Sequence, residues 1–277
     1  MGRLVVVPTP IGNLEDITLR AIRELRDATV ILAEDTRRTR TLLLRYDIHT
    51  PLLSYHQHNK RARLGRILSA LEDGDVALVS DAGMPSISDP GFELITAALD
   101  AGVEVDVLPG PSAVTTAVVA AAIPAPGFVF LGFLPRRSGD RRACLERLKS
   151  LEYALVLFEA PHRLVHTLRD ALEVLGDRPA VAARELTKLH QQVVRGTLAG
   201  IQEAFSNSDP RGEITLVIGG ASEPARDETD EARRELITRR AAGEDSRTAV
   251  AAVIQRFGIS RNAAYRLWLE TAPPTGP

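Results

Sequence analysis

The sequence contains little cysteine, no long hydrophobic run and almost no net charge. Its single cysteine, Cys144, excludes a disulfide framework or a cysteine-based metal site and suits a reducing compartment. The longest run of small and apolar residues, 113–123, is too short to cross a bilayer, and no signal-peptide pattern opens the chain. We therefore expect a cytoplasmic protein without a membrane span. The net charge of −2 also excludes a uniformly basic nucleic-acid binder.

The histidines show no spacing that is typical of metal ligands. We expect surface or hydrogen-bonded side chains at His49, His56, His58, His166 and His190. The sequence therefore predicts no metal site.

Positive charge is nevertheless concentrated in short segments. Between Arg136 and Lys149 there are six basic residues and two acidic ones. Two shorter clusters lie at 37–40 and 60–63. Each cluster alone is as consistent with a solvated helix face as with binding. Three clusters in a nearly neutral chain favour an anionic partner.

The first half of the chain alternates apolar, β-branched runs with helical stretches. Such runs are typical of buried strands in a parallel sheet, and we expect strands at 4–7, 29–33, 76–80 and 103–108. Helices are expected at 16–26 and 92–101. This alternation predicts an α/β fold.

A second set of strands and helices follows the segment "IPAPG" at 123–127, which we interpret as a boundary between an α/β domain at 1–122 and a second one at 123–221. The expected strands are 128–131, 154–158, 180–183 and 214–218. The expected helices are 142–150, 164–175 and 198–204.

The composition changes after the second α/β domain. Residues 222–236 are rich in acids and nearly devoid of apolar side chains, which predicts a linker leading into a helix. Residues 237–270 form a helical module in which helices at 248–257 and 262–269 resemble a helix-turn-helix, with Ser260 as an N-cap. This module is interpreted either as an RNA-docking device or as a small stabilising bundle.

Four loops rich in glycine or proline follow expected strands. In open α/β sheets, ligands bind outside the carboxyl ends of the strands. Gly83 lets the backbone approach a ligand, while Asp89 and Pro90 suit the N-cap and first turn of the next helix. Each loop alone is more typical of a turn, and none is a P-loop or a dinucleotide fingerprint. Together they favour a shared cleft: "PTPIGNL" (8–14), "DAGMPSISDPG" (81–91), "PGPSA" (109–113) and "EAPHR" (159–163).

These loops, together with "AEDTRRT" (33–39) and "ARELTKLH" (183–190), resemble the ribosomal RNA small subunit methyltransferase I group. That group belongs to the tetrapyrrole-methylase-like, class III methyltransferases. The resemblance covers roughly residues 3–220, with a shorter match at 237–269. It implies two α/β domains with S-adenosylmethionine in the cleft between them, and a homodimer. It also implies methyl transfer to a cytidine ribose 2′-oxygen in 16S rRNA.

The resemblance also implies which residues form the cofactor site. The cofactor pocket would have the backbone of the 81–88 stretch along the ligand and Ile214 against the adenine. The expected cofactor-binding residues are Ile11, Gly12, Asp81, Ala82, Gly83, Met84, Ile87, Ser88, Ser112, Ala113, Ala160 and Ile214. The clusters of positive charge and the terminal module, and not the resemblance, indicate the RNA-binding residues. These are Arg37, Arg38, Arg136, Arg137, Arg141, Arg142, Arg261 and Arg266.

Methyl transfer from a sulfonium needs no metal and no nucleophilic residue, so the protein mainly aligns the reacting atoms. A ribose hydroxyl is a weak acid, and a nearby base or cation helps to deprotonate it. We favour Glu159 as the base and Lys188 as the supporting cation. Every candidate has an alternative role in an ion pair that lines the cleft. The other candidates are Glu34, Asp35, His162, Arg184 and Glu185.

Two other functions remain open at this point. A chain of this fold could methylate a tetrapyrrole or a protein side chain, although the arginine clusters and the terminal module argue against both. Alternatively, the chain could be a regulator that binds nucleic acid and senses a small molecule without catalysis.

Overall fold

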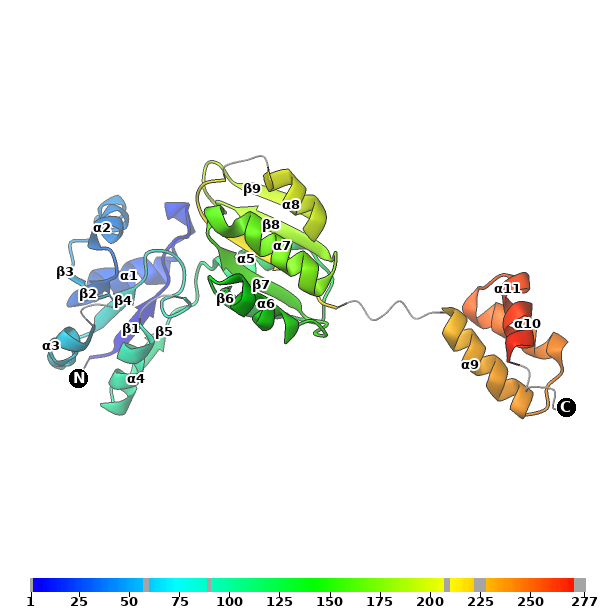
Figure 1. The fold of residues 1–277 in the computed structure, drawn as a ribbon. Helices are drawn as coiled ribbons and strands as arrows, with labels where there is room; N and C mark the ends of the chain where they lie inside the picture. The colour runs from blue at the N-terminus through cyan, green and yellow to red at the C-terminus, as the bar shows by residue number, and fades with distance from the viewer. Residues whose placement is uncertain (1, 57–59, 89–90, 207–209, 222–227, 272–277) are drawn as a thin grey trace. The chain divides into compact units, whose positions relative to one another are not determined.

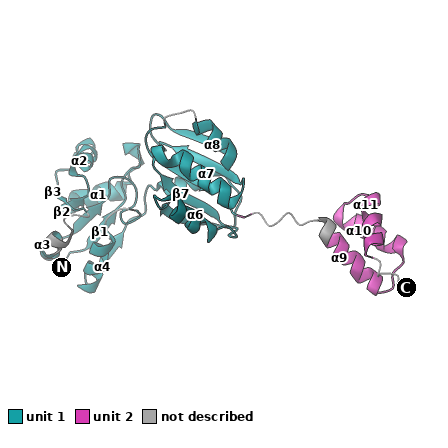
Figure 2. Ribbon diagram, in the orientation of Figure 1, with its two compact units in different colours: residues 1–220 teal, residues 221–277 magenta. Residues whose placement is uncertain are grey.

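The computed structural model describes residues 2–56, 60–88, 91–206, 210–221 and 228–271 (Figure 1). The chain divides into two compact units, residues 1–220 and 221–277, which Figure 2 colours separately. None of the helices in the described ranges is long and apolar enough to cross a membrane.

The first unit begins with a five-stranded parallel sheet in the order β3-β2-β4-β1-β5. Its strands are β1 (Leu4–Val7), β2 (Val30–Ala33), β3 (Leu52–Ser54), β4 (Val76–Val79) and β5 (Val105–Val107). Helices α1 (Leu19–Asp27) and α2 (Thr36–Arg45) pack on one face, and α3 (Lys60–Asp73) and α4 (Phe92–Asp100) on the other. Because successive side chains of a strand point to opposite faces, both faces carry apolar residues and the strands are continuously hydrophobic.

The second sheet has the order β6-β7-β10-β8-β9 and is mixed. Strands β6 and β7 are parallel, whereas β10 runs antiparallel to both β7 and β8. Helices α6 (Ser138–Glu146), α7 (Leu164–Leu175) and α8 (Leu198–Ser206) cover one face. The strands are β6 (Phe128–Phe133), β7 (Ala154–Glu159), β8 (Pro179–Arg184), β9 (Gln192–Thr197) and β10 (Ile214–Ile218).

Helix α5 (Ala113–Ala121) covers the other face of the second sheet. Its buried residues Val114 and Ala117 pack with Val156, Val181 and Val217 of β7, β8 and β10. The division between the two sheets therefore falls before α5 and not at 122/123, because the helix buries its apolar side against the sheet that follows it.

The second unit is a three-helix module of α9 (Glu228–Ala241), α10 (Ser246–Phe257) and α11 (Arg261–Glu270). Leu236, Val253 and Leu267 form part of its buried core. The expected linker at 222–236 is thus too long: residues from Glu228 onward are helical, because a few apolar side chains suffice to dock α9 on two partners. The N-cap at Ser260 is confirmed, since its hydroxyl oxygen accepts a hydrogen bond from the Ala263 amide at 3.2 Å.

Candidate functional site

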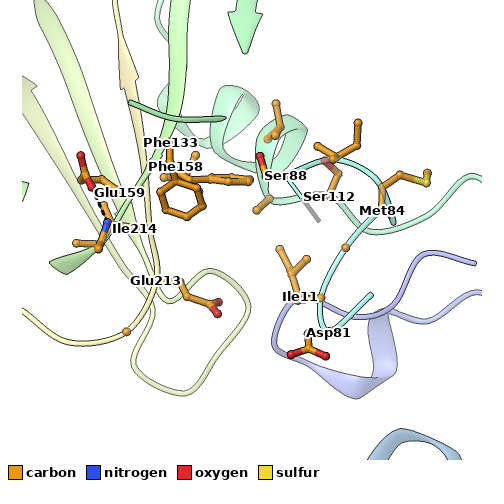
Figure 3. A pocket seen from close by; sticks show the side chains of 18 of the residues that line it. Ile11, Asp81, Met84, Ser88, Ser112, Phe133, Phe158, Glu159, Glu213 and Ile214 are labelled. Carbon is orange, nitrogen blue, oxygen red and sulfur yellow. Dashed lines mark hydrogen bonds between the residues drawn. The ribbon is translucent and has the colours of Figure 1, made fainter. Parts of the chain in front are cut away.

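A pocket of about 430 Å³ lies where the strand ends of the two sheets face each other in the first unit. This volume is within the range of small-molecule sites. Figure 3 shows the aromatic rings of Phe133 and Phe158 on one wall, with Met84, Ser88 and Ser112 across from them. The residues of the expected cofactor set that line it are Ile11, Asp81, Ala82, Gly83, Met84, Ile87, Ser88, Ser112, Ala113, Ala160 and Ile214.

Gly12 is the exception, because it does not line the pocket. A Cβ added at Gly12 would lie 2.5 Å from Cγ of Lys188 and 2.6 Å from Oγ1 of Thr187. The neighbouring amide of Asn13 donates a hydrogen bond to the same Thr187 oxygen at 3.0 Å. The glycine is therefore needed for close packing between the loops after β1 and β8.

The loop after β4 is fixed to the loop after β1. Thr9 and Gly83 exchange two backbone hydrogen bonds of 2.9 Å, and the Ser80 hydroxyl donates to the Gly83 carbonyl at 3.0 Å. Gly83 has φ = 78°, a conformation that favours glycine. Ser86 and Ser88 adopt φ of 71° and 66° without being glycines, which strains the backbone by about 1–2 kcal/mol each. Such strain is common in loops that hold ligands.

Helix α4 begins at the expected residue but with a different N-cap. Residues 89 and 90, expected as N-cap and first turn, lie outside the described residues. The helix begins at Phe92, with Gly91 as its N-cap.

The opposite wall depends on the mixed pairing of the second sheet. Because β10 runs antiparallel to β7, the first residue of β10, Ile214, lies opposite the last residue of β7, Glu159 (Figure 3). The start of one strand and the end of another thus reach the same edge of the pocket. This pairing brings Ala160 and Ile214 to one wall.

Glu159 is placed at the pocket but its carboxylate is fully engaged. The residue is only 1% exposed. Its oxygens accept hydrogen bonds from the Thr167 hydroxyl at 2.5 Å and the Ala160 amide at 2.8 Å. Arg163 Nε lies 3.1 Å from Oε1 as an ion pair, without the geometry of a hydrogen bond. The Glu159 carboxylate is therefore shielded from solvent and held by protein donors, which favours a structural role.

Lys188 is also engaged, and it does not line the pocket. Its ammonium group donates to Glu185 at 2.8 Å and to Glu213 at 2.9 Å. Burial opposes the charge, but these two hydrogen bonds outweigh it and raise the pKa of Lys188. Two carboxylates neutralise this lysine, which favours a structural role in the loop after β8.

Glu34 is a further carboxylate at the pocket. It follows β2, lines the pocket and has neither a hydrogen bond nor an ion pair among the described residues. Burial and the negative charge of Asp81 raise the pKa of Glu34, while Arg38 and His56 oppose this rise. Asp81 itself accepts from the Asp35 amide at 3.0 Å and lies 3.4 Å from the Arg38 guanidinium.

The remaining acid–base candidates have structural roles. Asp35 caps helix α2, and its hydrogen bonds from Arg37 hold the pKa of Asp35 far below its usual range. Burial of Glu185 opposes its charge, but the hydrogen bonds from Lys188 and the Glu213 amide outweigh it and lower the pKa of Glu185. Arg184 hydrogen-bonds Gln192 on the neighbouring strand. His162 lies in a short 3₁₀ turn after β7 and does not line the pocket.

The arginines of the 136–142 segment separate into two groups. Arg136 and Arg137 are exposed. Arg141 is only 4% exposed and pairs with buried Asp170, to which its Nε donates at 2.7 Å. Arg142 pairs with Asp170 and Glu173. The structure therefore contradicts RNA contact by Arg141, and it places Arg142 in an ion-pair network.

The other expected RNA contacts are exposed. Arg37 and Arg38 lie in the first turn of α2, where Arg38 also lines the pocket. In the second unit, Arg261, Tyr265 and Arg266 of α11 are exposed. Across the parts of the chain that the structure describes, no group of three His, Cys, Asp or Glu side chains could hold a metal ion.

Known proteins share this fold. The Tetrapyrrole (Corrin/Porphyrin) Methylases family model matches residues 3–202. Cobalt precorrin-4 methyltransferase aligns with a TM-score of 0.60 and 17% identity, covering 78% of this chain and 94% of that one. Uroporphyrin-III C-methyl transferase from Thermus thermophilus, complexed with S-adenyl homocysteine, aligns with a TM-score of 0.57 and 21% identity, covering 79% and 97%. The fold is thus that of an α/β methyltransferase class with two sheets.

Closer relatives narrow the assignment. A Thermotoga maritima protein named "Ribosomal RNA small subunit methyltransferase I" is 52% identical over 221 residues, which are 79% of this chain and 99% of that protein. A Micromonospora olivasterospora protein of the same name is 43% identical over 282 residues, 99% of this chain and 90% of that protein. The chain belongs to the tetrapyrrole methylase family, and the prediction of a methyltransferase is confirmed.

Proposed function

We propose that the protein transfers a methyl group from S-adenosylmethionine to the ribose 2′-oxygen of a cytidine in 16S rRNA of the small ribosomal subunit. The observation that carries this proposal is the pocket between the two sheets, lined by the loops that resemble this group of methyltransferases. The names of the relatives support the same substrate. We also propose a cytoplasmic location, because the names of the relatives place their substrate in the ribosome.

The pocket residues fit S-adenosylmethionine. The apolar side chains of Ile11, Phe158 and Ile214 offer a surface for an adenine ring. Carboxylates of Asp81 and Glu213 lie on opposite walls of the pocket and complement positive charge on the ligand (Figure 3). When bound, S-adenosylmethionine supplies an electrophilic methyl group on a positively charged sulfur.

The protein contributes mainly alignment and proton removal. Fixed loops such as the Thr9–Gly83 bridge hold the pocket in one geometry, and such positioning accounts for roughly 7–11 kcal/mol of a barrier. Glu34 is the proposed base, because it lines the pocket and has no hydrogen bond or ion pair among the described residues. It accepts the 2′-hydroxyl proton while Arg38 and Asp81 hold the same end of the site in place.

The RNA strand approaches the pocket over exposed arginines. Arg38 lies at the pocket itself, and Arg37, Arg136 and Arg137 are exposed on segments that lead away from it. Phosphate contacts from such side chains position RNA without reading its sequence. The exposed Arg261, Tyr265 and Arg266 face of the second unit is a further proposed RNA contact.

A transfer assay with tritium-labelled S-adenosylmethionine tests the proposal. The substrates are small ribosomal subunits from a strain that lacks the corresponding enzyme, a tetrapyrrole precursor and total protein. We expect label in 16S rRNA alone. Label in the tetrapyrrole precursor or in protein would show that this molecule, and not rRNA, accepts the methyl group. No label in any fraction would favour a regulator without catalytic activity.

We also propose a homodimer, as the family resemblance implies. Helix α5 leaves Val119 79% exposed, an apolar side chain that a second copy could cover. Sedimentation equilibrium with the Val119→Asp variant tests this assembly: we expect a dimer for the parent chain and a monomer for the variant.

A further inference from the structure

Strand β6 ends in an irregularity that exposes an aromatic ring. Its pairing with β7 shifts register between Phe130 and Phe133, and Gly132 within the shift has φ = 61°. This β-bulge re-aims the following side chain, as bulges commonly do near active sites. Phe133 is consequently 55% exposed although it lines the pocket.

The ring of Phe133 is supported from behind. Its centroid lies 5.8 Å from that of Phe158, whose ring packs edge-on against Phe130 at 5.0 Å. Across the pocket, a Cβ on Gly132 would come within 3.1 Å of the Ser88 hydroxyl oxygen, so the bulge reaches the opposite wall. Phe133 is therefore a supported aromatic surface with one open side (Figure 3).

The chain immediately after Phe133 is fixed by two partly or fully buried arginines. Arg163 donates to the Leu134 carbonyl at 2.8 Å, and Arg141 donates to the carbonyls of Pro135 and Arg136 at 3.3 and 3.2 Å. Asp170 in turn holds Arg141. This clamp sets the position of the exposed Arg136 and Arg137 relative to the ring.

Two exposed arginines follow the exposed ring of Phe133 by three and four residues. This arrangement is suitable for binding single-stranded nucleic acid. Aromatic side chains stack on splayed-out bases, and arginines contact the backbone phosphates beside them. A nucleotide that enters a pocket loses stacking on its neighbours, and an aromatic side chain at the pocket can replace that stacking.

We infer that Phe133 forms a stacking subsite for a nucleobase of the RNA substrate, with Arg136 and Arg137 on the adjoining phosphates. This inference rests on the proposed function. The competing occupant of the ring is the adenine of the cofactor. The position of Phe133 favours the RNA base, because β6 is the edge strand of its sheet whereas Ile214, the proposed adenine contact, lies on the central strand β10.

The test compares Phe133→Ala and Phe133→Leu with a control, Phe128→Ala, which removes a 41% exposed phenylalanine from the other end of the same strand. Three quantities are measured: the affinity for S-adenosylhomocysteine by calorimetry, the KM for small subunits, and kcat. We expect both Phe133 variants to raise the KM for RNA roughly 5- to 150-fold, the range expected for removing one base stack, with unchanged S-adenosylhomocysteine affinity. The control should match the parent protein in all three.

Other outcomes overturn the inference. Weakened S-adenosylhomocysteine binding in the Phe133 variants would assign the ring to the cofactor, and an unchanged KM for RNA would leave no stacking role. Because Phe133→Leu keeps an apolar side chain of similar volume, it separates loss of the ring from loss of folding. If the parent protein labels no RNA at all, the proposed function fails first, which is a distinct result.

Discussion

Glu34 and Glu159 both lie at the carboxyl end of a strand and both line the pocket, yet their environments differ. Glu159 is buried and accepts hydrogen bonds from Thr167 and Ala160, whereas Glu34 has no such partner among the described residues. The same contrast separates buried Arg141 from exposed Arg136. Residue type and position at a strand end therefore identify candidate functional residues. Whether the side chain already has hydrogen-bond partners within the protein then distinguishes a structural role from a role in catalysis or binding.

The largest expected effect belongs to Glu34→Gln. Removing a general base should lower the single-turnover methylation rate about 10²- to 10⁴-fold while S-adenosylhomocysteine affinity stays within a factor of about two. Because burial raises the pKa of Glu34, the parent rate should rise with pH through that raised value, and the variant should lose this limb. Asp81, Asp35, Arg38 and His56 surround the group and contribute to the position of the limb.

Stability gives a second readout for the same variant. A folded-state pKa above the unfolded value means that ionising Glu34 costs stability as the pH rises through the interval between them. Glu34→Gln should therefore be as stable as the parent protein or slightly more stable at neutral pH. If the Glu34→Gln variant is less stable than the parent protein but methylates at a normal rate per folded molecule, Glu34 has a structural role and is not the base.

The next effect is on stability at Arg141. Arg141→Ala leaves the buried Asp170 short of a partner, and breaking a buried pair typically costs about 3–5 kcal/mol of unfolding free energy. Burial opposes the charge of Asp170, but hydrogen bonds from Arg142, Ser138 and Arg141 lower its pKa. This stabilisation is present above the ordinary carboxyl pKa and is lost as the pH falls below it. Urea unfolding at several pH values measures it, and an unaltered unfolding curve in Arg141→Ala would contradict the clamp.

Glu159→Gln should have a smaller effect on stability and little on chemistry. Disturbing the hydrogen bonds to Thr167 and Ala160 leaves buried groups poorly satisfied, at a cost of about 1–3 kcal/mol. The single-turnover rate, corrected for the folded fraction, should stay within about threefold of the parent rate. A loss of rate as large as that expected for Glu34→Gln would restore Glu159 as the base.

The smallest expected effect is on the salt dependence of RNA binding. Replacing Arg136 or Arg137 by alanine removes one positive charge from the RNA phosphates. Each such replacement should reduce the magnitude of the slope of log K against log salt by roughly 0.7 on single-stranded RNA. Filter binding from low to moderate salt measures this slope for each alanine variant. Slopes identical to the parent slope would show that these arginines only solvate the loop.

Much of the fold could be predicted from the sequence, because buried strands with apolar runs have a clear pattern. Strands β1 and β10 and helix α7 begin and end where expected. Strand β9 was missed since its residues are mostly exposed. Helix α5 was not predicted either, so the boundary expected at 122/123 left its residues in the first domain although they pack on the second sheet.

The pocket was predictable to a large extent, whereas the roles within it were not. Glycine and proline mark loops at strand ends, and the family motifs fall on those loops. The exposure of Phe133 could not be predicted from the sequence. It results from a register shift in β6, and the alternation of apolar and polar residues does not reveal such a shift. The sequence could not distinguish the environments of Glu159 and Glu34, because the hydrogen bond from Thr167, eight residues away, depends on how a helix returns to its strand.

The central claim concerns where the methyl group goes. The most direct measurement is to digest 16S rRNA labelled by the purified protein to nucleosides and to identify the labelled nucleoside by mass spectrometry. We expect the label in 2′-O-methylcytidine, and its loss with the Glu34→Gln variant. A methyl group on a base carbon or nitrogen would contradict the account, because a carboxylate base poised for a ribose hydroxyl has no role in that reaction.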